Sequence, residues 1–399
     1  MRAGLCRACL VGSVLLAAAA GTGCSEGSQA EKAAATGSAK AAGTGVHIGA
    51  ERRVVLAGDP SSPLVEVAGA VRLSDGTIVV ANAGAQELQL FDASGRHLKT
   101  AGGEGDGPGE FRRLTRIRRG AGDSIYAFDS QERRISVFDP AGAFVRSFAL
   151  APVGRGLSPA PLGWFDDGTI LARVPSTDAL LRQDPGVVRD TLLYLRYAAG
   201  GTLIDTVGRF PGEEQVRVLE GDGRTRSSLV IPLPFGRRTE VAVAGDRFFV
   251  SEGTRFAVAK FGRDGSSTGL VGRTDRRPRE VTDGAKQAFL AEQLAKIGDP
   301  NGQREFRSRY ADVQYPDVMP AVGQVLADPA GRLWVADYRA PGEGETVWTV
   351  FDRSGAAIGT SRIPGQLEVL EIDAGEALCL RTDPDTGVEQ VQVHPVRTS

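Results

Sequence analysis

Five arginines in one short stretch are the side chains of this sequence best suited to ligand chemistry. They are Arg112, Arg113, Arg116, Arg118 and Arg119. A guanidinium group presents its donors in a planar fork that fits a carboxylate, sulfate or phosphate group. The stretch therefore predicts an anion-binding surface. The other interpretation is a solvated face whose charge is balanced by acidic residues close in sequence, namely Glu104, Asp106 and Glu110.

Polar residues elsewhere in the chain are expected on the same face of the fold. The candidate ligand-binding set consists of Arg112, Arg113, Arg116, Asp129, Asp337 and Arg339, and Asn82 is expected beside it. A second cationic run, with Arg273, Arg276, Arg277 and Arg279, is interpreted as solvent-facing. The first run lacks the interleaved aromatic residues typical of nucleic-acid binding, so we expect no nucleic-acid partner.

Histidine-dependent chemistry has little support in the sequence. The three histidines, His47, His97 and His394, fall in segments that are not expected to converge. This argues against a zinc or copper centre and against a Ser-His-Asp hydrolase. The motifs G-x-S-x-G and G-x-x-x-x-G-K-[ST] do not occur. No catalytic residue, metal ligand or cofactor is therefore predicted.

The composition is that of a turn-rich globular protein. The 399 residues include 52 glycines and 21 prolines, 41% are hydrophobic and 24% are charged. Such a chain is neither disordered nor a polytopic membrane protein. The formal net charge of −2 also lacks the cationic excess with which a general nucleic-acid binder displaces counterions.

The first 23 residues have the features of a signal peptide. Two arginines precede an apolar stretch from Leu10 to Ala20, which is too short to span a bilayer. Small residues and then Cys24 follow. This junction resembles a bacterial lipoprotein lipobox, although Gly21 stands where an aliphatic residue is usual. The resemblance implies that Cys24 is lipidated, and ordinary signal-peptide cleavage is the alternative.

The predicted organisation has three parts: a signal peptide at 1–23, a tether at 24–46 and a folded domain at 47–399. The tether is rich in Ala, Gly, Ser and Lys and has no apolar period, which is typical of flexible linkers. We expect an exported, membrane-anchored protein that faces the periplasm or the cell surface. Cys379 lies in an apolar run and is predicted to be a buried, unreactive thiol.

The body of the chain repeats two patterns. The first is a hairpin with a Gly or Asp turn, which recurs at 73–82, 120–129, 165–174, 243–252, 328–337 and 372–381. The second is a strand, a turn and a strand, and it recurs at 90–100, 137–147, 195–205, 260–270 and 350–360. Together they form a four-stranded antiparallel unit of about 45 residues, the size of a propeller blade. The sequence predicts an all-β fold, a six-bladed β-propeller of four-stranded antiparallel blades.

One part of the repeat carries a family resemblance. Residues 103–148 contain Gly109-Glu110-Phe111, a hairpin from Gly122 to Asp129, and the closing run Arg134-Ile135-Ser136-Val137-Phe138-Asp139. This arrangement resembles the NHL-type repeat. The resemblance implies an exported six-bladed β-propeller lipoprotein, a class of fold that hosts binders, scaffolds and enzymes alike.

Ring closure and insertions complete the expected architecture. The last repeat has three strands before the chain ends, so Arg52–Ala57 is predicted to supply its outer strand. The long connections fall at 149–160, 174–189, 209–239, 273–320 and 338–345, and all of them emerge on one face of the ring. Such one-sided insertions favour a binding surface; neutral drift of surface loops is the alternative.

The largest insertion, between blades 4 and 5, is predicted to contain a small helical unit. Thr282 or Asp283 caps a helix that runs to about Ile297 before Gly298, and a second short helix is expected at 302–311. Four aromatic residues, Phe289, Phe306, Tyr310 and Tyr315, accompany these helices. They would either cover the channel as a lid or bury the helices against the ring.

Three functional hypotheses remain open. The first is a binding or scaffold module with an envelope protein, an anionic small ligand or a glycan as partner, joined to the membrane through its lipid anchor alone. The second is a calcium-dependent lactonase or esterase, as in gluconolactonase-like propellers, with its site in the central channel. The inner strands are mainly apolar, and the carboxylates of Glu240, Asp328 and Glu371 occupy different positions in the repeat. The third is a passive structural subunit.

Overall fold

The computed structural model describes residues 44–399, except residues 60, 155, 177–185, 221–226, 274, 312, 374 and 384–385. The predicted signal peptide, Cys24 and most of the predicted tether therefore lie outside the described residues.

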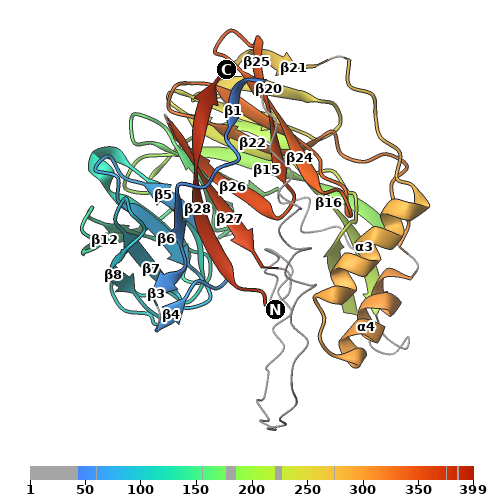
Figure 1. Ribbon diagram of the computed structural model, residues 1–399, viewed down its shortest axis with the longest axis horizontal. Coiled ribbons are helices and arrows are strands. Elements are labelled where there is room, and N and C mark those ends of the chain that lie inside the picture. The colour runs from blue at the N-terminus through green and yellow to red at the C-terminus, as the bar shows by residue number, and fades with distance from the viewer. Residues whose placement is uncertain are drawn as a thin grey trace, which may run out of the picture.

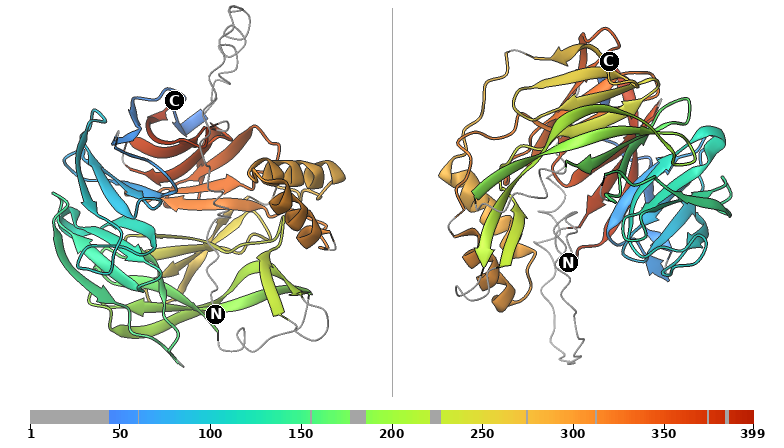
Figure 2. Two further views of the ribbon diagram at one scale, coloured as in Figure 1. Left: turned by 90° about the horizontal axis from the view of Figure 1, so that it is seen from below. Right: turned by 180° about the vertical axis from the view of Figure 1, so that it is seen from behind.

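Four-stranded antiparallel sheets follow one another around a ring (Figure 2, left). Blade 1 contains β5 (Val67–Arg72), β6 (Ile78–Asn82), β7 (Glu87–Phe91) and β8 (His97–Gly102). Blade 2 contains β9 (Leu114–Arg119), β10 (Ile125–Asp129), β11 (Arg134–Phe138) and β12 (Phe144–Ala149). In each blade the first strand lies innermost and lines the central channel of the ring.

Blade 3 is a five-stranded sheet, with β13 (Ala160–Trp164), β14 (Ile170–Pro175), β15 (Gly186–Tyr197), β16 (Leu203–Glu220) and β17 (Ser227–Pro232). Blade 4 contains β18 (Glu240–Ala244), β19 (Arg247–Ser251), β20 (Ala257–Gly262) and β21 (Ser267–Gly272). Blade 5 contains β22 (Val322–Ala327), β23 (Leu333–Asp337), β24 (Glu345–Phe351) and β25 (Ala357–Pro364). Blade 6 contains β26 (Leu367–Ile372), β27 (Glu376–Thr382) and β28 (Glu389–Thr398).

The N-terminal segment closes the ring as the sequence predicts. The short strand β2 (Val54–Leu56) pairs with β28 as the outer strand of blade 6. The strand β1 (Thr44–Ile48) adds a second closure, because it pairs with β25 of blade 5 on one side and with β28 on the other (Figure 1). Residues 44–46 are thus part of a strand, and their assignment to the tether was wrong. A further small hairpin, β3 (Gly58–Asp59) with β4 (Ser62–Pro63), follows.

The hydrophobic core is divided among the junctions between blades. In β6, Ile78 and Val80 join the cluster between blades 6 and 1, whereas Val79 and Ala81 join the cluster between blades 1 and 2. Alternate residues of a strand point to opposite faces of its sheet, so each sheet contributes to two junctions. Corresponding clusters fill the junctions between blades 2 and 3, 3 and 4, 4 and 5, and 5 and 6. This arrangement confirms the six-bladed propeller predicted from the repeats.

The same hydrogen-bond geometry recurs at the turns between the two outer strands of a blade, which explains why the Asp-x-x-Gly pattern repeats. The carboxylate of Asp92 accepts hydrogen bonds from the backbone N–H groups of Ser94 (2.9 Å) and Arg96 (3.0 Å). Asp352 makes the same contacts to Ser354 and Ala356. The glycine that follows has a positive φ, +90° at Gly95 and +93° at Gly355, which a residue with a Cβ rarely adopts.

The strand pairings place the connections on two opposite faces of the ring. We call "turn face" the face that carries the short turns such as 73–77, 92–96, 120–124 and 352–356. We call "insertion face" the face that carries the long connections at 150–159, 273–321 and 338–344. The segments at 174–189 and 209–239 emerge there too, but they were wrongly expected to be loops. Much of them extends β15 and β16 and forms β17, because Val187, Val216 and Ile231 continue the strand pattern.

The helical insertion has the predicted form. Helix α3 (Asp283–Ala295) begins after Thr282, whose side chain accepts a hydrogen bond from the backbone N–H of Ala285. Helix α4 (Pro300–Tyr310) begins after Asp299, whose carboxylate accepts from the N–H of Gly302. It starts earlier than the predicted 302, since Pro300 fits the first turn of a helix. Both helices lie beside the far end of β16 (Figure 1).

Candidate functional site

The five arginines of the first cationic run lie on β9 and on the two residues just before Leu114, at different places in the ring. Arg112 and Arg113 precede β9 on the insertion face, and Arg119 ends the same strand at the turn face. Arg116 reaches from the inner strand toward blade 3, where its Nη1 donates to the carbonyl oxygen of Leu162 (3.2 Å). The run therefore spans the whole height of the channel and does not form one patch.

The arginines at the two ends of this run are paired. Arg112 Nη2 donates to the Asp106 carboxylate (2.8 Å), and this ion pair raises the pKa of the Arg112 guanidinium. Arg119 pairs with Asp123 in the turn between β9 and β10. Arg113 leaves its side chain exposed. For Arg112, therefore, the alternative interpretation applies: its charge is balanced by the carboxylate of Asp106.

Asp129 forms hydrogen bonds with the backbone. Its side chain is fully buried, and its carboxylate accepts hydrogen bonds from the N–H groups of Arg112 (2.6 Å), Arg113 (3.2 Å), Gln131 (2.8 Å) and Glu132 (2.9 Å). Asp129 therefore fixes the end of the connection that leads into β9 and the turn between β10 and β11. It orients Arg112 and Arg113 without facing a ligand itself. Asn82 has the same kind of role in blade 1, where it bonds to Val65 and Glu87.

Asp337 and Arg339 lie on blade 5 and join the second cationic run. Arg276 Nη2 lies 3.0 Å from Asp337 Oδ2, and partial burial raises the pKa of the Asp337 carboxyl. Arg339 Nη1 donates to the carbonyl oxygen of Glu343 (3.1 Å). Blades 2 and 5 stand on opposite sides of the ring, and among the described residues no recorded hydrogen bond or ion pair joins Asp337 or Arg339 to Arg112 or Arg113. The predicted set therefore divides into two groups on the insertion face and one residue, Arg116, in the channel.

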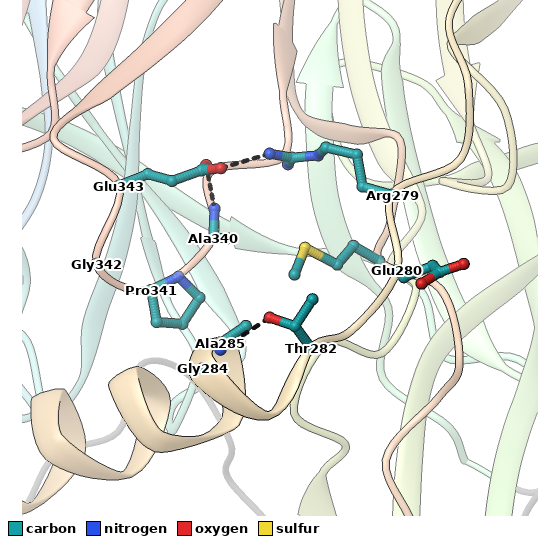
Figure 3. Close-up of a pocket in the computed structure, with 10 residues that line it drawn as sticks. Arg279, Glu280, Thr282, Gly284, Ala285, Ala340, Pro341, Gly342 and Glu343 are labelled. Atoms are coloured by element: carbon teal, nitrogen blue, oxygen red, sulfur yellow. Dashed lines mark hydrogen bonds and ion pairs between the residues drawn. The ribbon is translucent and has the colours of Figure 1, made fainter.

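A pocket of about 390 Å³ lies beside the blade 5 group, where the helical insertion meets the connection between β23 and β24. Its lining residues are Arg279, Glu280, Thr282, Gly284, Ala285, Met319, Ala340, Pro341, Gly342 and Glu343. Figure 3 shows Glu343 reaching both Arg279 and the backbone of Ala340, with Thr282 capping the first turn of α3. The distances are 2.6 Å for the ion pair and 2.7 Å for the bond from Ala340 N.

The chemistry of this pocket is mixed. Arg279 and Glu343 are each 42% exposed, so their ion pair is accessible to water and to ligand. Met319, Ala285 and Ala340 supply an apolar lining. From the sequence, Arg279 was expected only to face solvent. The signal that would have identified this pocket is that two predicted insertions, 273–320 and 338–345, belong to the same face and to adjoining elements.

The aromatic residues of the insertion bury the helices, as one of the two interpretations expected. Phe235, which follows β17, packs against Phe289 of α3 and against Tyr315, with ring centroids 6.0 Å apart in both pairs. The ring centroids of Phe306 and Tyr310 on α4 lie 4.6 Å apart, and these two rings extend the aromatic cluster around Phe289. Tyr310 also contacts the apolar cluster formed by Val216, Ile231, Leu233 and Val313. The insertions thus form one packed body beside the ring.

The carboxylates considered for a metal-dependent hydrolase do not come together. Glu240 begins β18 at the insertion face and Glu371 lies near the end of β26 at the turn face, because the inner strands all run in one direction. Asp328 is buried in a turn and accepts from Arg332 (2.6 Å) and Trp334 Nε1 (2.9 Å). Among the residues that the structure describes, no three His, Cys, Asp or Glu side chains are close enough to hold a metal ion.

The histidines and Cys379 occupy structural positions. His394 is buried and contacts the carbonyl oxygen of Gly49, whereas His97 lies on β8 next to Asp59. His47 lies on β1 and contacts the carbonyl oxygen of Gly45. Cys379 is fully buried, and burial raises the pKa of its thiol to about 12. The predicted burial of this thiol is confirmed, and a raised pKa is expected to keep it unreactive. Within the described residues, no helix is long and apolar enough to cross a bilayer.

Comparison with known proteins identifies the fold. Residues 60–153, which include blades 1 and 2, match the DUF5128 family model, described as a 6-bladed beta-propeller. The structure is similar to a member of the DUF4221 family from Bacteroides vulgatus, with 10% identity, a TM-score of 0.52, and coverage of 89% of this chain and 99% of that chain. A search of curated proteins gives no match.

Two further solved structures are similar at lower scores. One is a Bacteroides fragilis protein assigned as exported, with 12% identity, a TM-score of 0.47, and coverage of 87% of this chain and 94% of that chain. The other is a gluconolactonase from Xanthomonas campestris, with 14% identity, a TM-score of 0.41, and coverage of 90% and 98%. At these identities the similarity concerns architecture alone. The sheet topology, the segment that matches the family model and the similarity to the DUF4221 member establish that this chain folds as a six-bladed β-propeller.

Proposed function

We propose that this chain is a binding module of the bacterial cell envelope that engages its ligand through the insertion face. In this proposal the protein is an exported lipoprotein with NHL-type repeats, anchored through Cys24. The observation that carries the proposal is the packed body formed by α3, α4 and the β16–β17 hairpin, which joins the ring at the pocket lined by Arg279, Met319 and Glu343.

Packing of the insertions favours binding over neutral drift. A loop that accumulates residues by drift has no reason to bury aromatic side chains against another insertion. Here Phe235, which precedes blade 4, is 3% exposed and contacts Phe289 of α3. The contact joins two connections far apart in the sequence. A rigid body of this kind can present a surface of fixed shape to a partner, which lowers the entropic cost of binding.

The pocket suggests the chemistry of the ligand group that it takes. An anionic group can replace the Glu343 carboxylate as the partner of Arg279, since the exposed ion pair is held weakly. The apolar lining, which includes Met319, would accept an adjoining apolar part of the ligand. An anionic small ligand, a glycan with acidic groups or an acidic segment of an envelope protein meets these requirements. Arg276 and Arg339 next to the pocket add positive potential.

Native mass spectrometry of the full chain, extracted in detergent from its own membrane, tests this function. We expect a bound species that disappears from an Ala285→Trp variant, in which the new side chain fills the pocket. The matched control is Ala356→Trp, because Ala356 is exposed in a turn on the opposite face. A bound species retained by Ala285→Trp, or lost equally from both variants, would contradict the proposal.

The alternative function is a calcium-dependent lactonase or esterase with its site in the channel. The observation in its favour is that Glu240 and Glu371 belong to inner strands and that burial raises the pKa of both carboxyl groups. The described residues do not fit a calcium ion, however, because these two carboxylates lie toward opposite ends of the channel and Asp328 is engaged by Arg332 and Trp334. We therefore place the binding function first.

A further inference from the structure

The pocket that carries the proposed function is lined by a short strand with an open edge. Residues 279–281 run antiparallel to residues 317–319. Two recorded backbone hydrogen bonds join these segments, one of 2.9 Å from the N–H of Val281 and one of 2.8 Å from the N–H of Met319. Glu280, which lines the pocket, lies between the two bonds. The N–H and C=O groups of a residue in this position point away from the paired strand.

The backbone of Glu280 is left without a partner. Among the described residues, no recorded hydrogen bond uses its N–H or its C=O group. An unpaired donor and acceptor on a strand edge can pair with an extended chain, which then adds a strand. In an antiparallel addition, one residue of that chain forms both bonds, because it donates its own N–H to Glu280 and accepts from the Glu280 N–H. The edge therefore favours a peptide as the ligand.

The side chains of this short strand lie on two faces. Arg279 lies on the face toward the pocket, where it pairs with Glu343. Val281 lies on the same face and belongs to the apolar cluster that includes Met319. Glu280 lies on the other face, because neighbouring residues of a strand point in opposite directions, and Figure 3 shows its side chain pointing away from Glu343.

We propose that the pocket binds an extended peptide that adds antiparallel to residues 279–281 and has the pattern apolar, basic, acidic. This inference rests on the binding function proposed above and names its partner. Directly opposite residues of paired strands share a face. An acidic residue opposite Arg279 and an apolar residue opposite Val281 therefore point into the pocket, while a basic residue opposite Glu280 points to solvent. Because antiparallel strands run in opposite directions, the apolar residue comes first and the acidic residue last.

The charges around the pocket fit an acidic residue at this place. Arg279 and Glu343 are each 42% exposed, so an incoming carboxylate can compete with Glu343 for the guanidinium. Two further arginines lie nearby. Arg339 Nη1 donates to the carbonyl oxygen of Glu343 (3.1 Å), and Arg276 Nη2 lies 3.0 Å from Asp337 Oδ2. These cations lower the cost of placing a second carboxylate next to Glu343.

Fluorescence anisotropy of labelled peptides, titrated with the full chain in detergent, tests the proposal. One peptide carries Leu-Lys-Glu between flanking serines and threonines. The control carries Leu-Glu-Lys, which has the same composition but places like charges opposite Arg279 and Glu280. We expect the first peptide to bind at least about tenfold more tightly. Equal binding of the two peptides, or binding of neither, would overturn the proposal.

N-methylation of the first peptide tests the backbone bonds without altering the protein. A methyl group on the lysine nitrogen removes the N–H that bonds to Glu280, so we expect binding at least about tenfold weaker. The control is a methyl group on the glutamate nitrogen, whose N–H points away from the edge and whose loss should have little effect. Equal effects of the two methyl groups would contradict strand addition.

Glu280→Pro tests the same bond from the protein side. Proline lacks the N–H, and the protein loses no internal bond because it does not use this group. Glu280→Ala is the control, because it removes the same side chain and keeps the N–H. We expect Glu280→Pro to bind the first peptide at least about tenfold more weakly than Glu280→Ala, with the same Tm. Equal binding by the two variants would count against the proposal.

Failure of this inference and failure of the binding function give different results. If the peptides fail these tests but Ala285→Trp still removes the native bound species, the pocket takes a ligand of another class, such as a glycan or a small anion. The peptide proposal then falls alone. If Ala285→Trp retains the native species as well, the binding function falls with it.

Discussion

Arg279 and Glu343 join two insertions across the pocket, with Arg279 Nη1 2.6 Å from Glu343 Oε1. One belongs to the segment before α3 and the other to the connection between β23 and β24. Glu343 also accepts from the N–H of Ala340 (2.7 Å), which fixes its position in the connection. In the proposed binding function, Arg279 is the cationic group at the edge of the apolar pocket.

The first prediction separates binding from stability at this pair. Arg279→Ala should abolish the bound species seen by native mass spectrometry, because it removes the cation. It should change the free energy of unfolding by less than about 1 kcal/mol, since exposed ion pairs contribute little. Urea unfolding of the variant checks the second part. A loss of several kcal/mol would show that Arg279 is structural and would remove the argument for a ligand contact.

The second prediction concerns the buried Asp129. Asp129→Ala leaves four backbone N–H groups without their acceptor, so we expect a loss of about 3 kcal/mol or more in the free energy of unfolding. Asp139→Ala is the control, because Asp139 accepts one recorded bond, from the N–H of Ala143 in an exposed turn. Equal effects of the two substitutions in urea unfolding would contradict the role assigned to Asp129.

The third prediction concerns stability against pH. Burial raises the pKa of Glu371 from 4.5 to about 7. Between these values the folded state keeps a proton that the unfolded chain has released, so stability falls as the pH rises through this window. Glu371→Gln removes this loss and should stabilise the protein above the window by up to about 3 kcal/mol.

This stabilisation should vanish at about pH 4, below both pKa values, where Glu371 is protonated in the folded and the unfolded chain alike. Thermal unfolding of Glu371→Gln and of Glu368→Gln, an exposed carboxylate on the same strand, provides the comparison. A gain that is the same at every pH, or that Glu368→Gln reproduces, would argue against a buried carboxyl at position 371.

The fourth prediction addresses the calcium-dependent alternative. A ligand at about 100 times its dissociation constant stabilises a folded protein by about 2.7 kcal/mol, which is visible as a shift in Tm. We expect no shift with Ca²⁺, Zn²⁺ or a chelator and no hydrolysis of simple lactones. A shift specific to Ca²⁺ and reversed by the chelator would promote the hydrolase over the binding module.

Much of the fold could be predicted because its signals are local. The turn glycines and aspartates repeat at each blade, and their backbone geometry requires those residues at Asp92-Gly95 and Asp352-Gly355. The caps at Thr282 and Asp299 fix the starts of the helices. Closure by residues 52–57 was predictable because the last repeat lacks one strand, whereas the extra strand β1 lies in a segment whose composition resembles a linker.

The candidate site was less predictable because it depends on the direction in which each strand crosses the ring and on which residues meet at each end. Arg112 to Arg119 look like one cationic cluster in the sequence, but β9 carries them from one face of the ring to the other. Spacing also cannot distinguish a carboxylate aimed at a ligand from one such as Asp129 that accepts four backbone N–H groups. The pocket at Arg279 and Glu343 depends on contact between two insertions, which no single segment reveals.

Site-specific photo-crosslinking in the native envelope tests the central claim most directly. A photoreactive residue replaces Pro341, which lines the pocket, or Ser354, which is exposed on the turn face. We predict a discrete adduct from position 341 that is lost when Arg279→Ala is added, and none from position 354. Adducts from position 354 alone, or an adduct at 341 that is unaffected by Arg279→Ala, would contradict binding through the insertion face.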